Sequence, residues 1–308
     1  MAAEQSCDVI VIGGGPAGLS CALECFDIQL DTILVEATPA VGGQLAEIHH
    51  SVRNVASGQF EDGSALQRAL QDRAAIVGKR VRLSHRVTGV DLDDQWIEAH
   101  GKRFFFRTLV VATGTSRQDL PAAPDGGFGG DITYQLESDP HRFAGAAVAV
   151  IGGGDSSTLD ALALARDGAS VTLVHRSSAL TARRDIIEQV RAESRIEELP
   201  GWELEAVKGS ERLEGLVLVR RETGERRSLA VRGLVVKISR VPNTAVFRGH
   251  VQLNRSGAVL VDRDLQTSHV GVFAAGDVTA GAYARVAAAL GEGSLAARSV
   301  LRHLEGRS

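Results

Sequence analysis

The first residues that could do chemistry form a glycine cluster with the spacing GxGxxG after the apolar run 7–12 (CDVIVI). The residues of this cluster are Gly13, Gly15, Pro16, Ala17 and Gly18. In such a pattern the first glycine permits a tight turn, the second lets the backbone approach a pyrophosphate, and the third allows a helix to pack closely on a strand. Glu36 follows the next apolar run, 32–35, roughly 20 residues further on, where an acid accepts hydrogen bonds from ribose hydroxyls. We therefore predict a dinucleotide site, with a glycine-rich structural turn as the alternative.

The same pattern recurs after the apolar run 147–151 (AVAVI). The residues of this second cluster are Gly152, Gly154, Asp155, Ser156 and Ser157. Ser157 takes the third glycine position, where its small side chain still permits close packing. The next apolar run, 170–174, ends in His175 and Arg176, and an arginine there attracts a 2′-phosphate that an acid would repel. The pattern favours NADPH over NADH, with a solvated strand end as the alternative.

Both clusters require the same local structure to position them. Each apolar run reads as a β-strand, each glycine cluster as a turn, and the residues after it as a helix that is followed by another strand. A helix that begins at such a turn points the positive end of its dipole at the phosphates. The repeated order predicts an α/β protein with two Rossmann-like dinucleotide-binding folds.

Charge excludes some classes of partner. The 308 residues include 34 Lys and Arg against 38 Asp and Glu, a net charge of −4, which does not suggest nucleic acid or a membrane surface as the main partner. The N-terminal residues show no basic segment followed by a long apolar stretch, so we expect a cytoplasmic protein.

The three cysteines do not resemble a secreted disulfide framework, because Cys7, Cys21 and Cys25 crowd together near the N-terminus. Cys21 and Cys25 stand four apart on an expected helix, where Cβ atoms lie about 5 to 6 Å apart, too wide for a disulfide. We expect them to be small core hydrophobes. His49 and His50 are adjacent, and no group of residues has metal-ligand spacing, so we expect no metal site.

Several motifs together resemble one family. In chain order they are VIGGGPAG (11–18), GGQL (42–45), VVATG (110–114), VIGGGDSS (150–157), HR (175–176) and GVFAAGDV (271–278). Their order is similar to that of the low-molecular-weight thioredoxin reductase family, over nearly the whole chain. The branches that the chain most resembles include the ferredoxin or flavodoxin NADP reductases of thioredoxin reductase type and the bacillithiol-type disulfide reductases.

The resemblance implies an FAD-binding domain interrupted by an inserted NAD(P)H-binding domain, usually in a homodimer. Prolines mark connections at 120–124 (LPAAP) and 241–243 (VPN). We therefore expect the FAD-binding domain at 1–117 and 246–308, and the NAD(P)H-binding domain at 118–245.

The resemblance also implies which residues contact FAD. Those placed at the adenosine and pyrophosphate are Gly13, Gly15, Gly18 and Glu36, with Val87 beside the adenine. Those placed along the pyrophosphate and flavin are Gly43, Gln44, Leu45 and Asn54, while those closing over the dinucleotide are Ala112, Thr113 and Gly114. From GVFAAGDV, Gly276 and Asp277 would approach the ribitol or pyrophosphate, although Asp277 could also cap a helix. A helix starting near Arg285, Val286 and Ala287 would face the flavin edge that becomes negative on reduction.

The chain departs from thioredoxin reductases where they carry a redox CxxC. The four corresponding residues are Gln135, Leu136, Glu137 and Ser138, which cannot relay electrons as a dithiol. In the ferredoxin reductase relatives an aromatic ring four residues past GGQL stacks on the flavin, and His49, which has that position here, could stack or donate a proton. A loop histidine in solvent is the alternative. Those relatives extend past the final helix with a second ring over the other flavin face, whereas this sequence stops at Ser308, soon after Leu304. We therefore expect that face of the flavin to be open or covered by a dimer neighbour.

Three functions agree with these residues. The one we favour is an FAD-dependent reductase that takes hydride from NADPH and passes electrons directly to ferredoxin or flavodoxin. The second is a flavin-dependent reductase or oxidase of a small molecule, such as a low-molecular-weight disulfide. The third is a redox sensor that binds FAD without turnover. Arginines in an expected hairpin, 216–235, could offer an acidic protein a local basic face, or could be a solvated strand pair.

Overall fold

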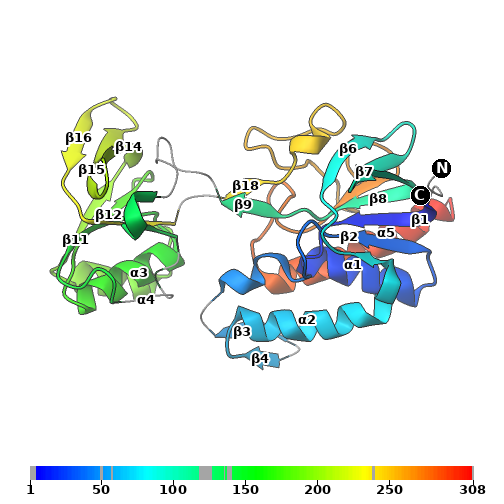
Figure 1. Ribbon diagram of the computed structural model, residues 1–308, viewed down its shortest axis with the longest axis horizontal. Helices are drawn as coiled ribbons and strands as arrows, with labels where there is room; N and C mark the ends of the chain where they lie inside the picture. The colour runs from blue at the N-terminus through cyan, green and yellow to red at the C-terminus, as the bar shows by residue number, and fades with distance from the viewer. Residues whose placement is uncertain are drawn as a thin grey trace. The chain divides into compact units, whose positions relative to one another are not determined.

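The computed structural model describes residues 5–48, 51–56, 58–117, 127–134, 136, 141–237 and 240–306. The chain divides into two compact units (Figure 1). The outer unit comprises Met1–Ser116 and Arg240–Ser308, and the inserted unit comprises Arg117–Ser239. Each is an α/β unit whose main sheet contains parallel strands, so the predicted fold class is confirmed.

The outer unit is built on one mixed sheet with the strand order β5-β2-β1-β8-β7-β6, in which β19 also pairs with β8. Its strands are β1 (Gln5–Ile12), β2 (Thr32–Val35), β5 (Val81–Arg82), β6 (Val87–Asp91), β7 (Trp96–Ala99), β8 (Lys102–Val111) and β19 (Val272–Ala274). The five strands β5, β2, β1, β8 and β19 are parallel, whereas β6 and β7 form antiparallel pairs at one side. Alternate residues of β1 enter two separate cores: Val9 and Val11 face one, Ile10 and Ile12 the other. The sheet is therefore buried on both faces, as a continuous apolar strand requires.

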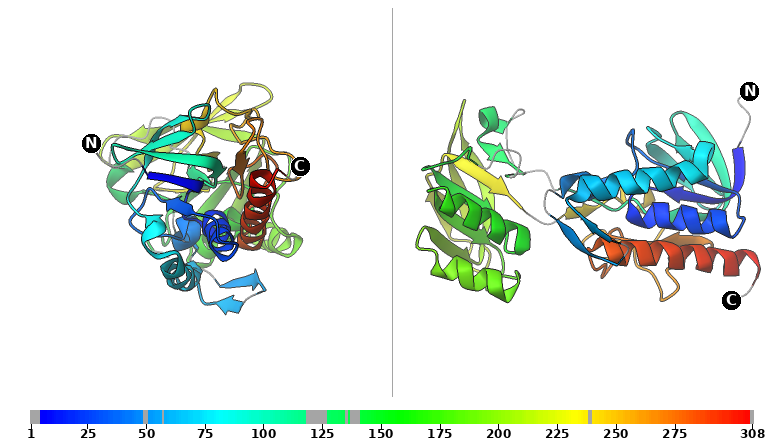
Figure 2. Two further views of the ribbon diagram at one scale, coloured as in Figure 1. Left: turned by 90° about the vertical axis from the view of Figure 1, so that its right-hand side faces the viewer. Right: turned by 90° about the horizontal axis from the view of Figure 1, so that it is seen from below.

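Among its described residues, the outer unit has the helices α1 (Pro16–Asp27), α2 (Gly63–Val77) and α5 (Val286–Leu304). Figure 2 shows them side by side on one face of the sheet. Gly293 of α5 lies where a Cβ would overlap the Ala17 carbonyl of α1, so the two helices approach closely at their backbones. The remaining short elements are η1 (Gly43–Glu47), β3 (Val52–Val55), β4 (Gly58–Phe60), η2 (Gly78–Arg80) and η5 (Ala245–Phe247).

The inserted unit has a five-stranded parallel sheet with the order β10-β17-β11-β12-β13. Its strands are β10 (Ile132–Thr133), β11 (Ala147–Ile151), β12 (Ser170–His175), β13 (Ile196–Pro200) and β17 (Gly233–Val236). Helices α3 (Asp155–Arg166) and α4 (Arg184–Ala192) pack on one core, and the other core lies under an antiparallel sheet. That sheet consists of β14 (Trp202–Gly209), β15 (Leu213–Arg220) and β16 (Arg226–Leu229), and a 3-10 turn, η3 (Gly127–Gly130), precedes β10.

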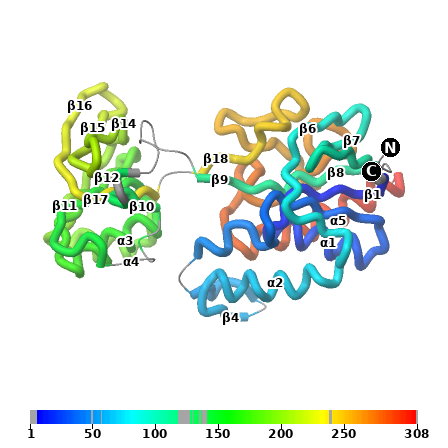
Figure 3. The backbone as a smooth tube through the Cα atoms, in the orientation of Figure 1, coloured from blue at the N-terminus to red at the C-terminus, as the bar shows by residue number. Residues whose placement is uncertain are grey.

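The chain passes between the units through β9 (Thr115–Arg117) and β18 (Arg240–Pro242), which pair as a two-stranded ladder (Figure 3). Asn243 N–H donates to the Gly114 carbonyl at 3.0 Å. The return boundary therefore lies at Ser239–Arg240, earlier than the one expected after residue 245, because β18 is already paired with the outer unit.

Candidate cofactor sites

The first glycine turn joins β1 to α1. Gly13 has φ +107°, and a Cβ there would overlap the Ala112 carbonyl. A Cβ on Gly18 would overlap the Gly13 carbonyl, so these two glycines are required by the packing of the turn itself. Gly15 differs, because a Cβ there would have nothing within 4 Å. The turn thus leaves a bare backbone facing open space at its second glycine, which fits a pyrophosphate that must approach closely.

Helix α1 begins directly beyond Gly15, its N-cap, with Pro16 at the first helical position. No side chain caps this end. The first amides of a helix lack intrahelical acceptors and carry the positive end of the dipole. The end of α1 can therefore accept an anionic group.

Glu36 lies beside the same turn and is 7% exposed. Its Oε2 accepts from Gly14 N–H at 2.5 Å, and its Oε1 accepts from the amide and the hydroxyl of Thr38, each at 2.7 Å. The carboxylate thus holds two loops together, and its remaining lone pairs can still accept from a ribose hydroxyl. The Glu36 carbonyl accepts from His85 N–H at 2.8 Å, while Val87 is half-buried in β6 against the outer-unit core.

The GGQL segment forms η1 beside the first turn. Gly43 has φ +54°, and a Cβ there would lie 3.2 Å from the Gly15 Cα, so the two glycines adjoin. Gln44 Nε2 donates to the carbonyl and the hydroxyl of Thr115 at 2.9 and 3.0 Å. Leu45 is 2% exposed and anchors the turn in a small core. Asn54 of β3 is exposed.

The end of β8 is fixed by a residue that the sequence analysis missed. Asn243 Nδ2 donates to the Thr113 carbonyl at 2.9 Å, and Thr113 Oγ1 donates to the Asn243 carbonyl at 2.8 Å. Ala112 is buried, and Gly114 has φ +62°. Asn243 thus sets the path of 112–114 over the first glycine turn.

Asp277 lies in the loop after β19. Burial raises the pKa of its carboxyl, and the charge of Arg240 opposes that rise. Within the part of the chain that the structure describes, no hydrogen-bond donor reaches this half-buried carboxylate. The adjacent Gly276 N–H is already bound to Glu292 Oε2 at 2.7 Å. Asp277 is therefore an acceptor without a donor among the described residues, as a residue that binds ligand hydroxyls would be.

Helix α5 begins at Val286, with Arg285 as N-cap and Ala287 in its first turn, close to the expected start. No side chain caps this end either. The Arg285 guanidinium lies 5.1 Å from the centroid of the Tyr283 ring, and Tyr283 is 69% exposed. Three ligand-compatible features of the outer unit, the starts of α1 and α5 and the Asp277 carboxylate, agree with a bound FAD.

Arg240 is a second residue that the sequence analysis missed. Its Nη1 lies 2.9 Å from Glu47 Oε2, and its Nε donates to Thr115 Oγ1 at 3.1 Å. Gln44 binds the same Thr115, so β18, η1 and β9 meet at one residue. Residues 47, 115 and 240 are far apart in the sequence, and no local pattern signals their contact.

The second glycine turn joins β11 to α3. Gly152 has φ +141°, and a Cβ there would lie 2.5 Å from the Lys237 carbonyl. Gly154 is the N-cap of α3, again without a side-chain cap. Ser157 is 1% exposed and donates to the Gly154 carbonyl at 2.8 Å, so this small residue packs as expected. Asp155 Oδ1 accepts from Arg183 N–H at 2.8 Å, while Ser156 is exposed.

His175 and Arg176 lie in different environments although both follow β12. His175 is 3% exposed, its Nε2 lies 3.0 Å from Glu198 Oε1, and its Nδ1 has no partner in the described ranges. A Cβ on Gly153 would be 3.1 Å from the His175 Cβ, so His175 lies directly beneath the glycine turn. Arg176 is exposed beyond the strand. Of the two, only Arg176 presents its side chain at the surface.

Two sequence expectations fall on residues outside the described ranges. These are His49 and, of the four residues at the CxxC positions, Gln135, Glu137 and Ser138. Leu136 is described and is 3% exposed.

The cysteines are core residues. Cys7, Cys21 and Cys25 are all buried and free. Burial raises the pKa of the Cys7 thiol to about 12, and a hydrogen bond with Cys25 together with burial raises the pKa of Cys21 above its usual value. Protonated, buried thiols are poor nucleophiles. Among the described residues no cluster of three metal-ligating side chains occurs, and no helix is long and apolar enough to cross a membrane.

Several arginines of the expected hairpin are paired with acids. Arg226 binds Glu205 at 2.7 Å, Arg227 lies 3.3 Å from Glu197, and Arg221 lies 3.8 Å from Glu203. Because of these ion pairs, the hairpin is better described as solvated strands of mixed charge than as a basic docking face.

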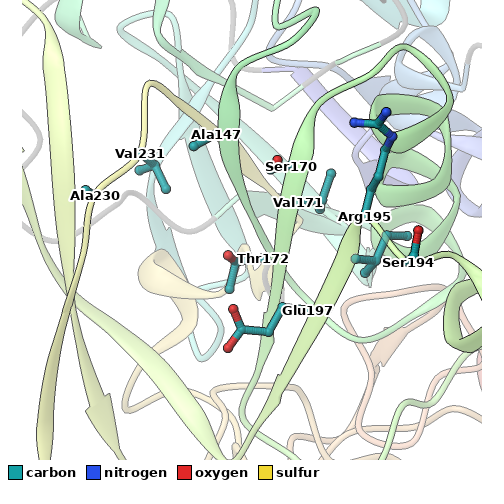
Figure 4. A pocket seen from close by; sticks show the side chains of 10 residues that line it. Ala147, Ser170, Val171, Thr172, Ser194, Arg195, Glu197, Ala230 and Val231 are labelled. Carbon is teal, nitrogen blue, oxygen red and sulfur yellow. The ribbon is translucent and has the colours of Figure 1, made fainter.

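A shallow groove of about 340 Å³ lies in the inserted unit (Figure 4). Its lining includes Ala147, Ser170 and Ile196, the first residues of β11, β12 and β13. Dinucleotides bind at the carboxyl ends of parallel strands, so this groove is at the opposite edge from the glycine turn.

Comparison with known proteins identifies the relatives of this chain. Residues 7–293 match the family described as pyridine nucleotide-disulphide oxidoreductase. The chain is 31% identical to a thioredoxin reductase of Streptomyces coelicolor, over 94% of this chain and 91% of that protein. It is 26% identical to a 34.2 kDa protein in the rubredoxin operon of Clostridium pasteurianum, over all of both chains. The crystal structure of Lactococcus lactis thioredoxin reductase in its FR conformation matches 97% of this chain and 99% of that one, with TM-score 0.82 and 26% identity.

Proposed function

The chain belongs to the pyridine nucleotide-disulphide oxidoreductase family, and from this premise we propose that it passes electrons from NADPH through FAD directly to an external acceptor, without an internal dithiol. It is an FAD-dependent NAD(P)H oxidoreductase of thioredoxin reductase type, and its cofactors are FAD and NADPH. Its acceptor is a protein or a small molecule.

The proposal rests chiefly on the small number of cysteines and on their burial. The sequence contains three, and all are buried in the outer unit: Cys7 in β1, and Cys21 and Cys25 on α1. Thiol relay requires an accessible thiolate, and burial opposes its formation. We therefore infer that no pair of cysteines in this chain carries electrons as a dithiol, and that the acceptor contacts the flavin directly.

In this proposal the outer unit binds FAD. Gly15 and the start of α1 receive the pyrophosphate, Glu36 the adenosine ribose, and Asp277 a hydroxyl of the ribitol. The start of α5 stabilises negative charge at one edge of the flavin. Bound FAD supplies a ring that accepts a hydride and can release the two electrons singly.

The inserted unit binds NADPH in this proposal. The uncapped start of α3 beyond Gly154 receives the pyrophosphate. Arg176 reads the 2′-phosphate, whereas His175, buried on Glu198, supports the turn from below. Two copies of the chain would form a homodimer, as the family resemblance implies.

The acceptor that we propose is ferredoxin or flavodoxin. The GGQL segment followed by His49 resembles the reductases of these carriers, and one full-length relative is a protein of a rubredoxin operon. A small-molecule acceptor is the second candidate, because direct access to the flavin would serve it equally well.

The experiment measures NADPH oxidation by the purified, FAD-loaded protein with cytochrome c as terminal acceptor. We expect added ferredoxin or flavodoxin to raise the rate of cytochrome c reduction, and thioredoxin to have no effect. Rapid turnover with a low-molecular-weight disulfide, at a rate that ferredoxin and flavodoxin leave unchanged, would assign the small-molecule function instead. Absence of flavin reduction by NADPH would leave only a sensor that binds FAD.

A further inference from the structure

We propose that Arg183 is a second reader of the NADPH 2′-phosphate, acting with Arg176. This inference rests on the proposed use of NADPH by the inserted unit. Arg183 lies outside the HR motif, seven residues beyond Arg176 and at the N-cap of α4.

The chain after β12 folds back onto the second glycine turn and brings Arg183 there. Thr181 donates to the Gly153 carbonyl twice, from its amide at 2.8 Å and from its hydroxyl at 3.2 Å. Two residues later the Arg183 amide donates to Asp155 Oδ1 at 2.8 Å, in the first turn of α3. Backbone bonds thus fix the Arg183 Cα at the edge where the glycine turn and the end of β12 meet.

The Arg183 side chain is available to a ligand. Its Nε lies 3.7 Å from Asp155 Oδ2 and 3.9 Å from Asp185 Oδ1, longer than the 2.7 to 2.9 Å typical of a strong charge-assisted bond. The guanidinium is 64% exposed and Asp185 is 68% exposed, so these pairs contribute little. A phosphate dianion with three acceptor oxygens can compete for the same donors.

The glycine turn leaves room for that ligand. A Cβ on Gly154 would have Thr181 Oγ1 as its nearest neighbour, at 4.0 Å. The buried His175 Nδ1, 3.7 Å from where a Gly153 Cβ would lie, has no partner among the described residues. An open turn, an uncapped helix and an unpartnered buried nitrogen therefore meet at this edge, which Arg176 and Arg183 flank.

Arg184 supplies a matched control. It follows Arg183 directly and carries the same charge, but its Nε is bound to Glu188 Oε1 at 3.0 Å, one turn along α4. It is 93% exposed, so its removal should disturb the fold as little as removal of Arg183. Arg183→Ala keeps the backbone amide that binds Asp155, so the loop path should persist.

The test is calorimetric titration of the FAD-loaded protein with 2′,5′-ADP and with 5′-AMP, which differ in the 2′-phosphate. We expect the wild type to prefer 2′,5′-ADP, and Arg183→Ala to reduce that preference about tenfold while leaving 5′-AMP binding unchanged. Arg176→Ala should reduce it similarly, Arg184→Ala should not, and Arg183→Lys should restore part of it because the charge remains.

Three results would overturn the inference. If Arg183→Ala behaves like Arg184→Ala while Arg176→Ala loses the preference, Arg183 does not recognise the 2′-phosphate. The proposed NADPH site would still be supported by the result for Arg176. If Arg183→Ala weakens both nucleotides equally, Arg183 supports the site without reading the 2′-phosphate. A wild type with no preference for 2′,5′-ADP would refute both this inference and the NADPH preference on which it rests.

Discussion

Gly15 and Gly18 belong to one motif, but the absence of a side chain has a different purpose at each position. A side chain on Gly18 would overlap the Gly13 carbonyl, so Gly18 is required by the folded chain. A side chain on Gly15 would meet no protein atom within 4 Å, so folding alone does not require glycine there. Gly15 also has φ −70° and ψ −177°, which any residue can adopt. What Gly15 leaves open is space for a ligand.

This difference makes Gly15→Val a selective probe of FAD binding. We expect the variant to fold, with a loss of about 1 kcal/mol because valine is a poorer N-cap than glycine, but to purify without flavin, because the new side chain occupies the pyrophosphate space. Flavin absorbance relative to protein concentration gives the occupancy, and thermal unfolding of both apoproteins gives the stability. Gly291→Val is the control, since Gly291 on α5 also has open space around it. Full flavin occupancy in Gly15→Val would refute the assignment of this turn to FAD.

Asp277 gives FAD binding a dependence on pH. Burial raises the pKa of its carboxyl in the free protein, and a ligand hydroxyl that donates to the carboxylate would lower that pKa again. FAD affinity should therefore be full above the raised pKa and should fall as the pH drops through it. Asp277→Asn should bind FAD about tenfold more weakly at neutral pH, because a charged acceptor is lost. It should also lose most of this pH dependence.

The measurement is the FAD dissociation constant of the reconstituted apoprotein, followed by flavin fluorescence across acidic to neutral pH. Parallel pH profiles for wild type and Asp277→Asn would remove Asp277 from the account of FAD binding.

At the scale of elements, one buried acid connects the two sheets of the inserted unit. Asp131, directly before β10, accepts from Arg212 Nε at 2.9 Å, from Arg212 Nη2 at 2.8 Å and from Leu213 N–H at 2.9 Å. Asp131 is 5% exposed. The bond with Arg212 lowers the pKa of Asp131. The parallel sheet and the β14–β15 hairpin are thus joined at one carboxylate.

We expect Asp131→Ala to destabilise the inserted unit by about 1 to 3 kcal/mol, chiefly because it leaves the buried Leu213 amide without an acceptor. Arg212 is 68% exposed and can return to water, so its lost charge pairing adds little. Since the pKa is lowered in the folded state, the carboxylate stabilises above the unfolded pKa of about 3.9 and this contribution disappears as the pH falls through the folded pKa. Denaturant unfolding should therefore show a smaller difference between wild type and variant at strongly acidic pH than at neutral pH, but the difference should not vanish, because a protonated Asp131 still accepts from the Leu213 amide. A constant difference between them would contradict the ionic part of this explanation.

At the scale of the whole molecule, local patterns were predictable and distant contacts were not. Both glycine turns, their strands and the start of α5 could be predicted because each is a short run of residues with one physical reason for its spacing. The contacts of Arg240 with Glu47 and of Asn243 with Thr113 could not, since they join residues more than a hundred positions apart. His175 shows the same limit: its position at a strand end was predictable, but its burial against Glu198 depends on a third strand.

The number of electrons that the protein stores depends on whether a redox-active dithiol accompanies the flavin. A flavin takes up two electrons, whereas a flavin with a redox-active dithiol takes up four. With three buried, free cysteines, this chain should store only the first pair. This capacity does not depend on which acceptor follows.

The most direct measurement is an anaerobic titration of the FAD-loaded protein with NADPH, followed by flavin absorbance and by a count of reactive thiols in the native protein. We predict that about one equivalent of NADPH per flavin completes the reduction, and that the thiol count is the same before and after. Consumption of a second equivalent before the flavin is fully reduced, with two new reactive thiols, would contradict the direct transfer of electrons from flavin to acceptor.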